Sequence, residues 1–296
     1  MAHNSPVSAL PFEILAPARW TAPAVFNSPH SGNHYAADFL RQSRLSALAL
    51  RKSEDCFIDE LFISCLDHGA PLLRTDVPRA YIDLNREPYE LDPRMFSDPL
   101  PGYVNTKSTR VAAGLGTIPK VVAEGEDIYR EKLAYAEATR RIEGIYLPYH
   151  RALAALLNQV AADSHPVLLL DCHSMPSSAL THIPHGAAVD VVLGDRFGTS
   201  CDPGITDLVE TELIARGFSV LRNKPYAGGF ITQNHGQPNK GRHALQIELN
   251  RAIYMQETSL EKLRDFEAVK QSLGLAISAV LSALPQLMSP VSLAAE

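Results

Sequence analysis

The sequence has only four cysteines in 296 residues, and no two of them form a Cys-x-x-Cys pair. This scarcity argues against a disulfide framework and against a structural zinc knuckle. There is no block of five or more basic residues, and 27 basic against 33 acidic side chains give a formal net charge of −6. Nucleic-acid binding depends mainly on basic side chains that neutralise phosphates, so we expect no nucleic-acid partner.

Signals for secretion or membrane insertion are also scarce. The N-terminal residues lack the basic stretch followed by a continuous apolar stretch that marks a secretion signal. The most apolar segment, residues 273–288, is interrupted by Ser278, Ser282 and Pro285. It falls short of the roughly 20 apolar residues that cross a bilayer. We therefore expect a cytoplasmic protein with no membrane partner.

Short apolar segments alternate with amphipathic ones, which is typical of a layered α/β domain. We predict a single α/β domain over residues 1–296. Residues 88–119 are rich in proline, glycine, aspartate, serine and threonine, and they predict a long loop excursion, which is usually functional or disordered. The expected strands cover residues 24–32, 70–77, 81–85, 166–174, 190–195, 218–225 and 244–251.

Helices are expected between these strands. Residues 142–160 carry apolar side chains at three- and four-residue spacing, and Pro148 should kink that helix or split it in two. Residues 205–216 and 259–284 are interpreted as further helices. Gly217 stands where a glycine commonly ends a helix.

Polar side chains follow several expected strands, at the edge where open α/β sheets bind ligands. His30 follows the first strand, and His173 follows a buried strand beside Asp171, so both suit a metal site. Each also has a structural interpretation, as a turn residue or as a satisfied core histidine. Cys172 beside His173 raises the alternative of a thiol nucleophile, but adjacent strand residues point to opposite faces.

Acidic residues near these positions have two interpretations each. Glu54 and Asp55 begin an expected helix, where acidic side chains normally cap the helix and complement its dipole. Asp83 lies among arginines in a strand-like segment, and a structural ion pair would explain it. Glu248 is a carboxylate in an apolar strand, which suits either a general base or a salt bridge to Arg251.

Seven blocks of sequence resemble, in their order and spacing, the N-formylglutamate amidohydrolase (deformylase) family. That family is similar to zinc carboxypeptidases and to the aspartoacylase and succinylglutamate desuccinylase group. These proteins combine a mixed sheet between helical layers with a zinc site of two histidines and one carboxylate. The resemblance therefore implies a three-layer, zinc-carboxypeptidase-like α/β fold. The blocks extend from about Pro11 to Tyr254 and read NSPHSGNHY, SEDCFIDELF, PRAYIDLNRE, DCHSMP, DVVLGDRFGTSC, NKPYAGGFIT and HALQIELNR.

The resemblance implies the metal ligands and the catalytic residues. His30 in PHSG resembles the first zinc ligand and His173 in DCHS the last. The compact His-x-x-Glu of the carboxypeptidases is absent, so the carboxylate ligand is assigned to Asp55, with Glu54 as the alternative. Glu248 in QIELNR resembles the catalytic glutamate, and Arg79 is assigned to catalysis with it.

The resemblance also implies a pocket for the substrate. Asn85 and Arg86 resemble an Asn-Arg pair that holds the substrate carboxylate. A dicarboxylate needs at least two cationic contacts, and the candidates are Arg79, Arg86, Lys224 and Arg251. The other pocket residues implied are Asn27, Tyr226, Gly228, Gly229 and Arg251.

The implied reaction is hydrolysis of N-formyl-L-glutamate to L-glutamate and formate, by a zinc-activated water with Glu248 as general base. We expect one zinc ion per chain, although other divalent metals fit such a site. The partner is then a small-molecule N-acyl amino acid, and the implied pathway is histidine degradation. The alternatives are a related hydrolase for another N-acyl or N-formyl amino acid, and a non-catalytic protein that binds an amino-acid derivative. The oligomeric state is not indicated.

Overall fold

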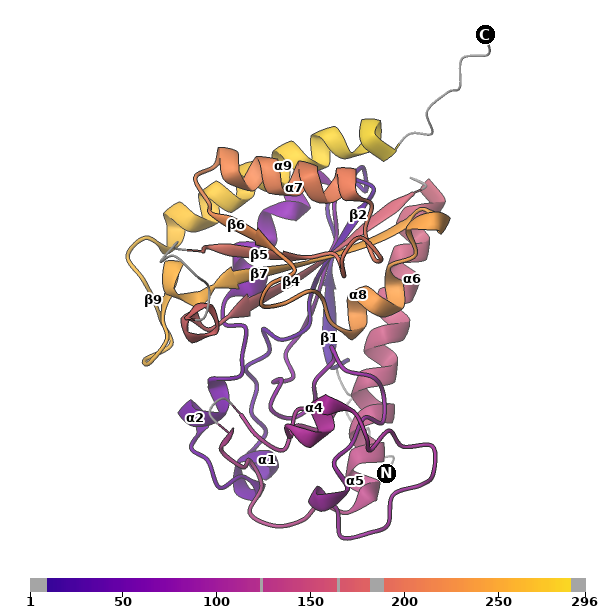
Figure 1. Ribbon diagram of the computed structural model, residues 1–296, viewed down its shortest axis with the longest axis vertical. Coiled ribbons are helices and arrows are strands. Elements are labelled where there is room, and N and C mark those ends of the chain that lie inside the picture. The colour runs from indigo at the N-terminus through magenta and orange to yellow at the C-terminus, as the bar shows by residue number, and fades with distance from the viewer. Residues whose placement is uncertain (1–9, 123–124, 164–165, 182–188, 289–296) are drawn as a thin grey trace, which may run out of the picture.

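The computed structural model describes residues 10–122, 125–163, 166–181 and 189–288. A mixed β-sheet runs through the molecule with the strand order β1-β3-β2-β4-β7-β5-β6 (Figure 1). The strands are β1 (Phe12–Leu15), β2 (Ala24–Ser28), β3 (Leu72–Thr75), β4 (Val167–Met175), β5 (Val191–Gly194), β6 (Val220–Arg222) and β7 (Arg242–Asn250).

Both parallel and antiparallel pairs occur in this sheet. The central strands β3, β2, β4 and β7 are parallel, whereas β1 is antiparallel to β3 and β5 is antiparallel to β7. The carboxyl ends of β2, β4 and β7 therefore meet at one edge, as predicted. A separate short hairpin joins β8 (Met255–Gln256) to β9 (Glu261–Lys262).

Helices cover both faces of the sheet, which confirms the predicted three-layer arrangement. The helices α7 (Pro203–Ala215) and α9 (Phe266–Met288) lie on one face, and α6 (Leu147–Asp163) and α8 (Phe230–His235) lie on the other (Figure 1). Strand residues alternate between two apolar cores, as the two-residue period of a strand requires. Leu168 and Leu170 pack toward α7 and α9, whereas Val167 and Leu169 pack toward α6.

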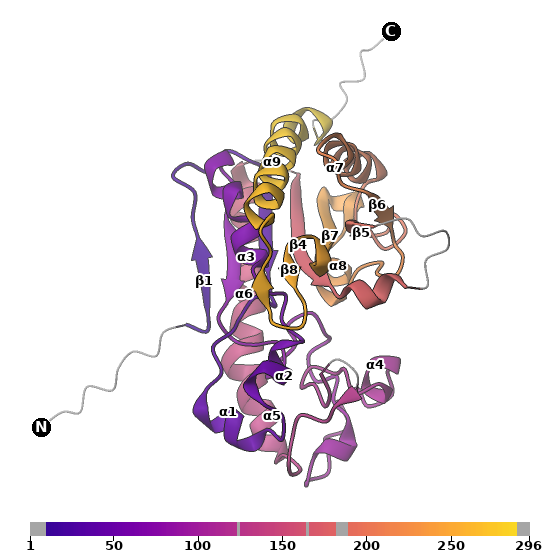
Figure 2. The same ribbon diagram turned by 90° about the vertical axis from the view of Figure 1, so that its left-hand side faces the viewer.

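Short helices form a second part of the molecule beyond the sheet. The helices α1 (Ala37–Gln42), α2 (Ala47–Arg51), α4 (Thr109–Ala112) and α5 (Tyr135–Arg141) gather at the bottom of both views (Figures 1 and 2). The predicted excursion, 88–119, belongs to this part and contains α4 and a short 3-10 helix (Pro93–Met95). Its buried Leu91, Val104 and Ile118 pack into the same core as α6, so the excursion is anchored along its length.

The prediction of a strand at residues 81–85 is wrong. These residues form a turn segment, in which Tyr81 N bonds to Pro78 O and Asp83 N bonds to Thr117 O in the excursion. Ile82 and Leu84 are buried in the α6 core. Their alternation with polar residues imitates a strand, but the backbone pairs with the excursion and not with the sheet.

The predicted helix at 142–160 is part of a longer helical run. It starts in α5, passes through a π-helical segment (Ile142–Tyr146) and continues as α6. The π segment comes directly before Pro148, which has no N–H to donate to the preceding turn. The predicted split at this proline therefore takes the form of one widened turn.

The other two predicted helices differ mainly at their ends. The helix α7 begins at Pro203, after Asp202 accepts a hydrogen bond from Gly204 N, and it ends before Gly217, whose φ is +89°. The helix α9 begins at Phe266 and not at residue 259, because the β8–β9 hairpin occupies the intervening residues.

The helix α9 is long enough and apolar enough to cross a membrane, by length and composition. The expectation that this segment is too short is therefore wrong, since its serines and Pro285 do not end the helix. In the structure, one face of α9 is buried against the sheet beside α7, through residues such as Leu273, Ile277 and Leu284 (Figure 1). That packing accounts for the apolar composition of the helix.

Candidate active site

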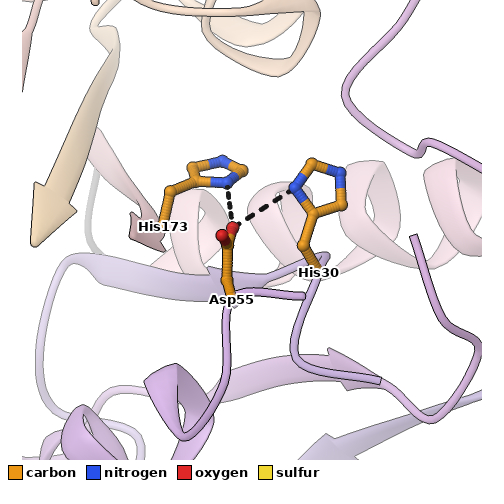
Figure 3. A group of neighbouring side chains, drawn as sticks. All are labelled: His30, Asp55 and His173. Atoms are coloured by element: carbon orange, nitrogen blue, oxygen red, sulfur yellow. Dashed lines mark hydrogen bonds and ion pairs between the residues drawn. The ribbon is translucent and has the colours of Figure 1, made fainter. Parts of the chain in front are cut away.

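Three donor groups converge beyond the carboxyl ends of β2 and β4 (Figure 3). His30 lies in the turn after β2, Asp55 lies shortly before α3 (Ile58–Leu61), and His173 belongs to β4. The Nδ1 atoms of His173 and His30 lie 3.0 and 3.4 Å from Asp55 Oδ2. All three side chains are buried, and their donor atoms lie within 4.8 Å of one another. Such spacing suits three ligands of one cation.

The far side of each imidazole contacts a further carboxylate. His30 Nε2 lies 2.8 Å from Asp83 Oδ1, and His173 Nε2 lies 3.0 Å from Asp171 Oδ2. The contact of His30 with Asp83 is a hydrogen bond, and a proton on His30 Nε2 leaves the Nδ1 lone pair of His30 directed at the cluster. His30 Nδ1 has no hydrogen-bond partner among the residues that the structure describes. A buried acceptor of this kind would be satisfied by a cation, so the residues fit a divalent metal ion.

The charges around the cluster favour a cation as well. Burial opposes ionisation of Asp55, but hydrogen bonds and charge from His173 and His30 hold its pKa well below the usual range. Burial lowers the pKa of His173, yet the charge and hydrogen bond of Asp171, followed by the bond to Asp55, raise it well above its usual value. Surroundings that attract a proton to this imidazole so strongly also attract a metal ion.

The second oxygen of Asp55 is held separately. Oδ1 accepts hydrogen bonds from Ser174 Oγ at 3.0 Å and from Arg251 Nη2 at 3.3 Å. Arg251 also donates to Ser174 Oγ and to the carbonyl of Lys52. With Oδ1 occupied, Asp55 presents Oδ2 alone to the two imidazoles.

Glu248 lies beside the cluster on β7. It is paired with His173 across β4 and β7, and Gln246 Nε2 donates to its Oε1 at 2.7 Å. Burial raises the pKa of Glu248 to about 7, against the opposing charge of His173. A carboxyl group with that pKa exchanges a proton readily near neutral pH, as a general base must.

Comparison with known proteins identifies the family. A sequence model described as N-formylglutamate amidohydrolase matches residues 22–255, a span that contains the cluster and Glu248. The chain belongs to the N-formylglutamate amidohydrolase family. It is similar to N-formylglutamate deformylase from Pseudomonas aeruginosa, with 32% identity over 251 residues that cover 83% of this chain and 86% of the relative. The Pseudomonas putida protein of the same name is 31% identical over 252 residues, with the same coverage.

Solved structures agree with this assignment. The crystal structure of N-formylglutamate amidohydrolase from Ralstonia eutropha JMP134 superposes with a TM-score of 0.87 and 35% identity. The superposition covers 94% of this chain and 99% of that one. A similarity of this extent means that the whole described fold is that of the family.

In this member of the N-formylglutamate amidohydrolase family, the cluster opens into a cavity of about 610 Å³. Small-molecule sites occupy roughly 300–1,000 Å³. Among the residues that the structure describes, five basic and two acidic side chains line the cavity, so this lining is positive although the chain carries a net charge of −6. That local charge favours an anionic ligand. The five basic residues are Lys52, Arg79, Arg86, Arg110 and Arg251.

Most of the predicted pocket residues reach this cavity, but Asn27 and Lys224 do not. Lys224 is exposed outside the lining. Asn27 lies beneath the site, where it donates to Asp171 Oδ1 at 2.7 Å and accepts from the Tyr149 hydroxyl at 2.6 Å. The structure thus gives Asn27 a supporting position and no place in the pocket wall. The predicted residues that line the cavity are Arg79, Asn85, Arg86, Tyr226, Gly228, Gly229, Glu248 and Arg251.

The two candidates for the carboxylate ligand are distinguished by their partners. Glu54 is buried, but its carboxylate pairs with Arg51 Nε at 3.1 Å and lies outside the cluster. Asp55 lies inside it. Consecutive side chains point in different directions here, so one acidic residue reaches the imidazoles and its neighbour faces away.

Two glycines shape the wall that holds Asn85. Its Oδ1 accepts a hydrogen bond from Ile231 N at 2.8 Å, and its Nδ2 lies 3.2 Å from His173 Nε2. A Cβ atom on Gly229 would lie 2.4 Å from both polar atoms of the Asn85 amide. Gly228 has a φ of +119°, which side chains rarely adopt. Gly229 therefore leaves room for Asn85, and both glycines line the cavity.

Sequence reasoning missed three relationships. The contact of Asp83 with His30 crosses 53 residues, although its nearby arginines marked it as unusual. Gln246 shares a strand face with Glu248 two residues later, and that period-two spacing was an available signal. Arg110 lines the cavity from the excursion and has no local signal at all.

The alternative of a thiol nucleophile loses support in the structure. Cys172 is fully buried in the core beneath α7 and α9, on the opposite face of β4 from His173. Burial raises the pKa of its thiol well above the usual value, so the reactive thiolate is strongly disfavoured.

Proposed function

We propose that this protein hydrolyses N-formyl-L-glutamate to L-glutamate and formate, with one divalent cation held by His30, Asp55 and His173. The observation that carries the proposal is the buried cluster beside Glu248, on the floor of a positively charged cavity. The names of the similar Pseudomonas proteins support the substrate. Zinc is the metal we expect, because two imidazoles and one carboxylate suit it.

When bound, the cation supplies Lewis acidity, which polarises a carbonyl group and lowers the pKa of a water molecule. Glu248 is placed to take a proton from the attacking water, because it lines the cavity and Gln246 holds one of its two carboxylate oxygens, Oε1. As the bond between the formyl carbon and nitrogen breaks, Glu248 returns that proton to the leaving amine. The new bond joins the water oxygen to the formyl carbon, which leaves as formate.

Arg79 is proposed to stabilise the developing oxyanion. Its Nε donates to Asp83 Oδ2 at 3.0 Å, which fixes the plane of the guanidinium beside the cluster. Its two terminal nitrogens remain available toward the cavity that Glu248 also lines. Preorganised donors aimed at a developing charge contribute strongly to such reactions.

The test measures metal content together with formate release from N-formyl-L-glutamate, with and without a chelator. About one metal per chain and chelator-sensitive formate release are the expected results. Metal without turnover would indicate that the substrate is another N-acyl or N-formyl amino acid, which a panel of such compounds would identify. Neither metal nor turnover after addition of zinc would favour a non-catalytic binding protein.

The remaining expectations also stay proposals. We propose that the partner is a small N-acyl amino acid, that the protein acts in the cytoplasm, and that it serves histidine degradation. Organisation of residues 1–296 as one domain and the predicted lack of nucleic-acid and membrane partners stay predictions too. Fractionation of cells and limited proteolysis of the purified chain are the measurements that check location and domain structure.

A further inference from the structure

The excursion places a basic side chain in the cavity wall. Arg110 lies in the short helix α4, where Ser108 Oγ accepts a hydrogen bond from Val111 N and Val111 is buried. Three residues after this helix, the carbonyl of Leu115 accepts a hydrogen bond from Arg86 Nε at 2.9 Å. The segment that carries Arg110 is therefore fixed relative to Arg86.

Three guanidinium groups form a series that leads away from the metal cluster. Arg79 is nearest: its Nε lies 3.0 Å from Asp83 Oδ2, and Asp83 Oδ1 lies 2.8 Å from His30 Nε2. Arg86 comes next, because its Nη2 lies 3.6 Å from the same Asp83 Oδ2. Arg110 is the most exposed of the three side chains and has no ion pair with Asp83 among the described residues, so it is the outermost member. Burial lowers the pKa of Arg86 and the positive charge of Arg110 lowers it further, which places Arg110 beside that residue. Asp83 compensates the charges of Arg79 and Arg86, whereas Arg110 adds a further like charge to the same wall.

Arg110 is poorly satisfied within the protein. Its nearest acidic partner among the described residues is Glu90, at 3.9 Å from its Nη1, which is too long for a hydrogen bond. The Glu90 carboxylate already accepts bonds from the Ser108 hydroxyl and from Glu87 N. The side chain of Arg110 is 37% exposed, on the cavity side. Its planar fork of donors is therefore available for a carboxylate.

We propose that Arg110 binds the side-chain carboxylate of the substrate and thereby selects formylated acidic amino acids over neutral ones. This inference rests on the proposed hydrolysis of an N-formyl amino acid. In such a substrate the α-carboxylate is attached to the carbon next to the scissile nitrogen, so it must lie near the cluster, within reach of Arg86. The side-chain carboxyl carbon of glutamate is two bonds farther from that carbon than the α-carboxyl carbon is, and Arg110 is the farther guanidinium.

The test compares Arg110→Gln with the unaltered protein on N-formyl-L-glutamate and on N-formyl-L-glutamine. The two substrates have nearly the same shape and differ in one negative charge. We expect kcat/KM for the glutamate substrate to fall about 10- to 100-fold, mainly through KM, because a charge-assisted contact is lost. Activity on the glutamine substrate should change less than about twofold, so that the preference for the acid disappears.

A matched control is available in the same excursion. Arg94 is paired with Asp92 and does not line the cavity, so Arg94→Gln should leave both activities unchanged. Arg110→Lys keeps the charge but loses the planar fork, and it should retain part of the preference.

Two results would overturn the inference. Arg110→Gln could retain the preference for the acid, or it could lose activity equally on both substrates, as a merely structural residue would. If the unaltered protein hydrolyses neither compound, the proposed function fails on its own. Calorimetry with the metal-loaded protein then still tests Arg110, since N-formyl-L-glutamate should bind more tightly than the glutamine analogue, and only while Arg110 is present.

Discussion

His173 and Glu248 stand opposite each other in the parallel pairing of β4 with β7. Side chains of paired residues point to the same face of a sheet, and neighbouring strands lie about 4.8 Å apart. Both residues therefore lie in regular strands that are hydrogen-bonded to each other, and neither is carried by a loop. The sheet therefore sets the spacing between the proposed metal ligand and the proposed base.

Replacement of this base should separate chemistry from metal binding. We predict that Glu248→Gln lowers kcat by about 10²- to 10⁴-fold, because general base catalysis contributes about that much. Metal content should stay near one per chain, since the amide does not disturb the three ligands. Formate release and metal analysis on the same preparation check this. Glu267→Gln, on the exposed start of α9, is the matched control; a Glu248→Gln protein that keeps most of its activity would refute the role.

Arg251 was predicted to contact substrate, and its bonds to Asp55 and Ser174 give it a second interpretation. We predict that Arg251→Gln weakens metal affinity about 10- to 100-fold, the usual effect of losing a group that orients a ligand. Competition with a chromogenic chelator measures that affinity. Ser174→Ala removes a bond to the same carboxylate oxygen and should act in the same direction. If Arg251→Gln instead raised KM and left the metal affinity unchanged, the result would support the predicted contact of Arg251 with the substrate.

A single methyl group at Gly229 should displace Asn85. The added Cβ would lie 2.4 Å from the Asn85 amide, well inside contact distance. We predict that Gly229→Ala lowers kcat/KM at least about tenfold and lowers the melting temperature, since overpacking typically costs about 1–3 kcal/mol. Gly102→Ala is the control, because a Cβ there meets nothing within 4 Å. Equal activity and melting temperature of the two variants would contradict the prediction.

The pH dependence of activity follows from Glu248. A general base works only as the carboxylate, so activity is present above its pKa and is lost as the pH falls through it. Burial raises that pKa to about 7, and the charge of a bound metal ion would lower it again. We predict that kcat/KM declines on acidification with an apparent pKa at or below about 7. A pH profile of kcat/KM checks this, and a rate that stays level down to about pH 4 would contradict it.

The sequence predicted the parts of the fold that depend on local pattern. The apolar run before His173 predicted a strand buried on both faces, and β4 is that strand. The strand prediction for residues 81–85 was wrong, because Ile82 and Leu84 are buried in a turn at the two-residue spacing that is typical of a strand. The hydrogen bond from Asp83 N to Thr117 O joins this turn to the excursion. A contact between residues so far apart in the chain leaves no signal in the local sequence pattern.

In the candidate site, too, some residues could be predicted from the sequence and others could not. His30, Asp55, His173 and Glu248 could be named from the resemblance, and the structure brings all four together. The position of Arg110 depends on how a long, aperiodic segment packs, which spacing along the chain does not determine. Asn27 lies near the carboxyl end of β2, yet its amide is used by Asp171 and Tyr149 below the cavity.

The widened turn before Pro148 has a geometric consequence. On its N-terminal side, Arg141 Nη1 donates to Tyr81 O at 3.0 Å; on its C-terminal side, the Tyr146 hydroxyl donates to Arg86 O at 2.6 Å, and His150 Nε2 lies 2.9 Å from Leu84 O. All three contacts secure one short turn. An α-helix advances about 100° per residue. The extra residue of the π segment therefore sets the rotation of the helix after the segment relative to the helix before it. Removal of that residue would leave the helix intact, but the side chains after the segment would no longer point toward the turn.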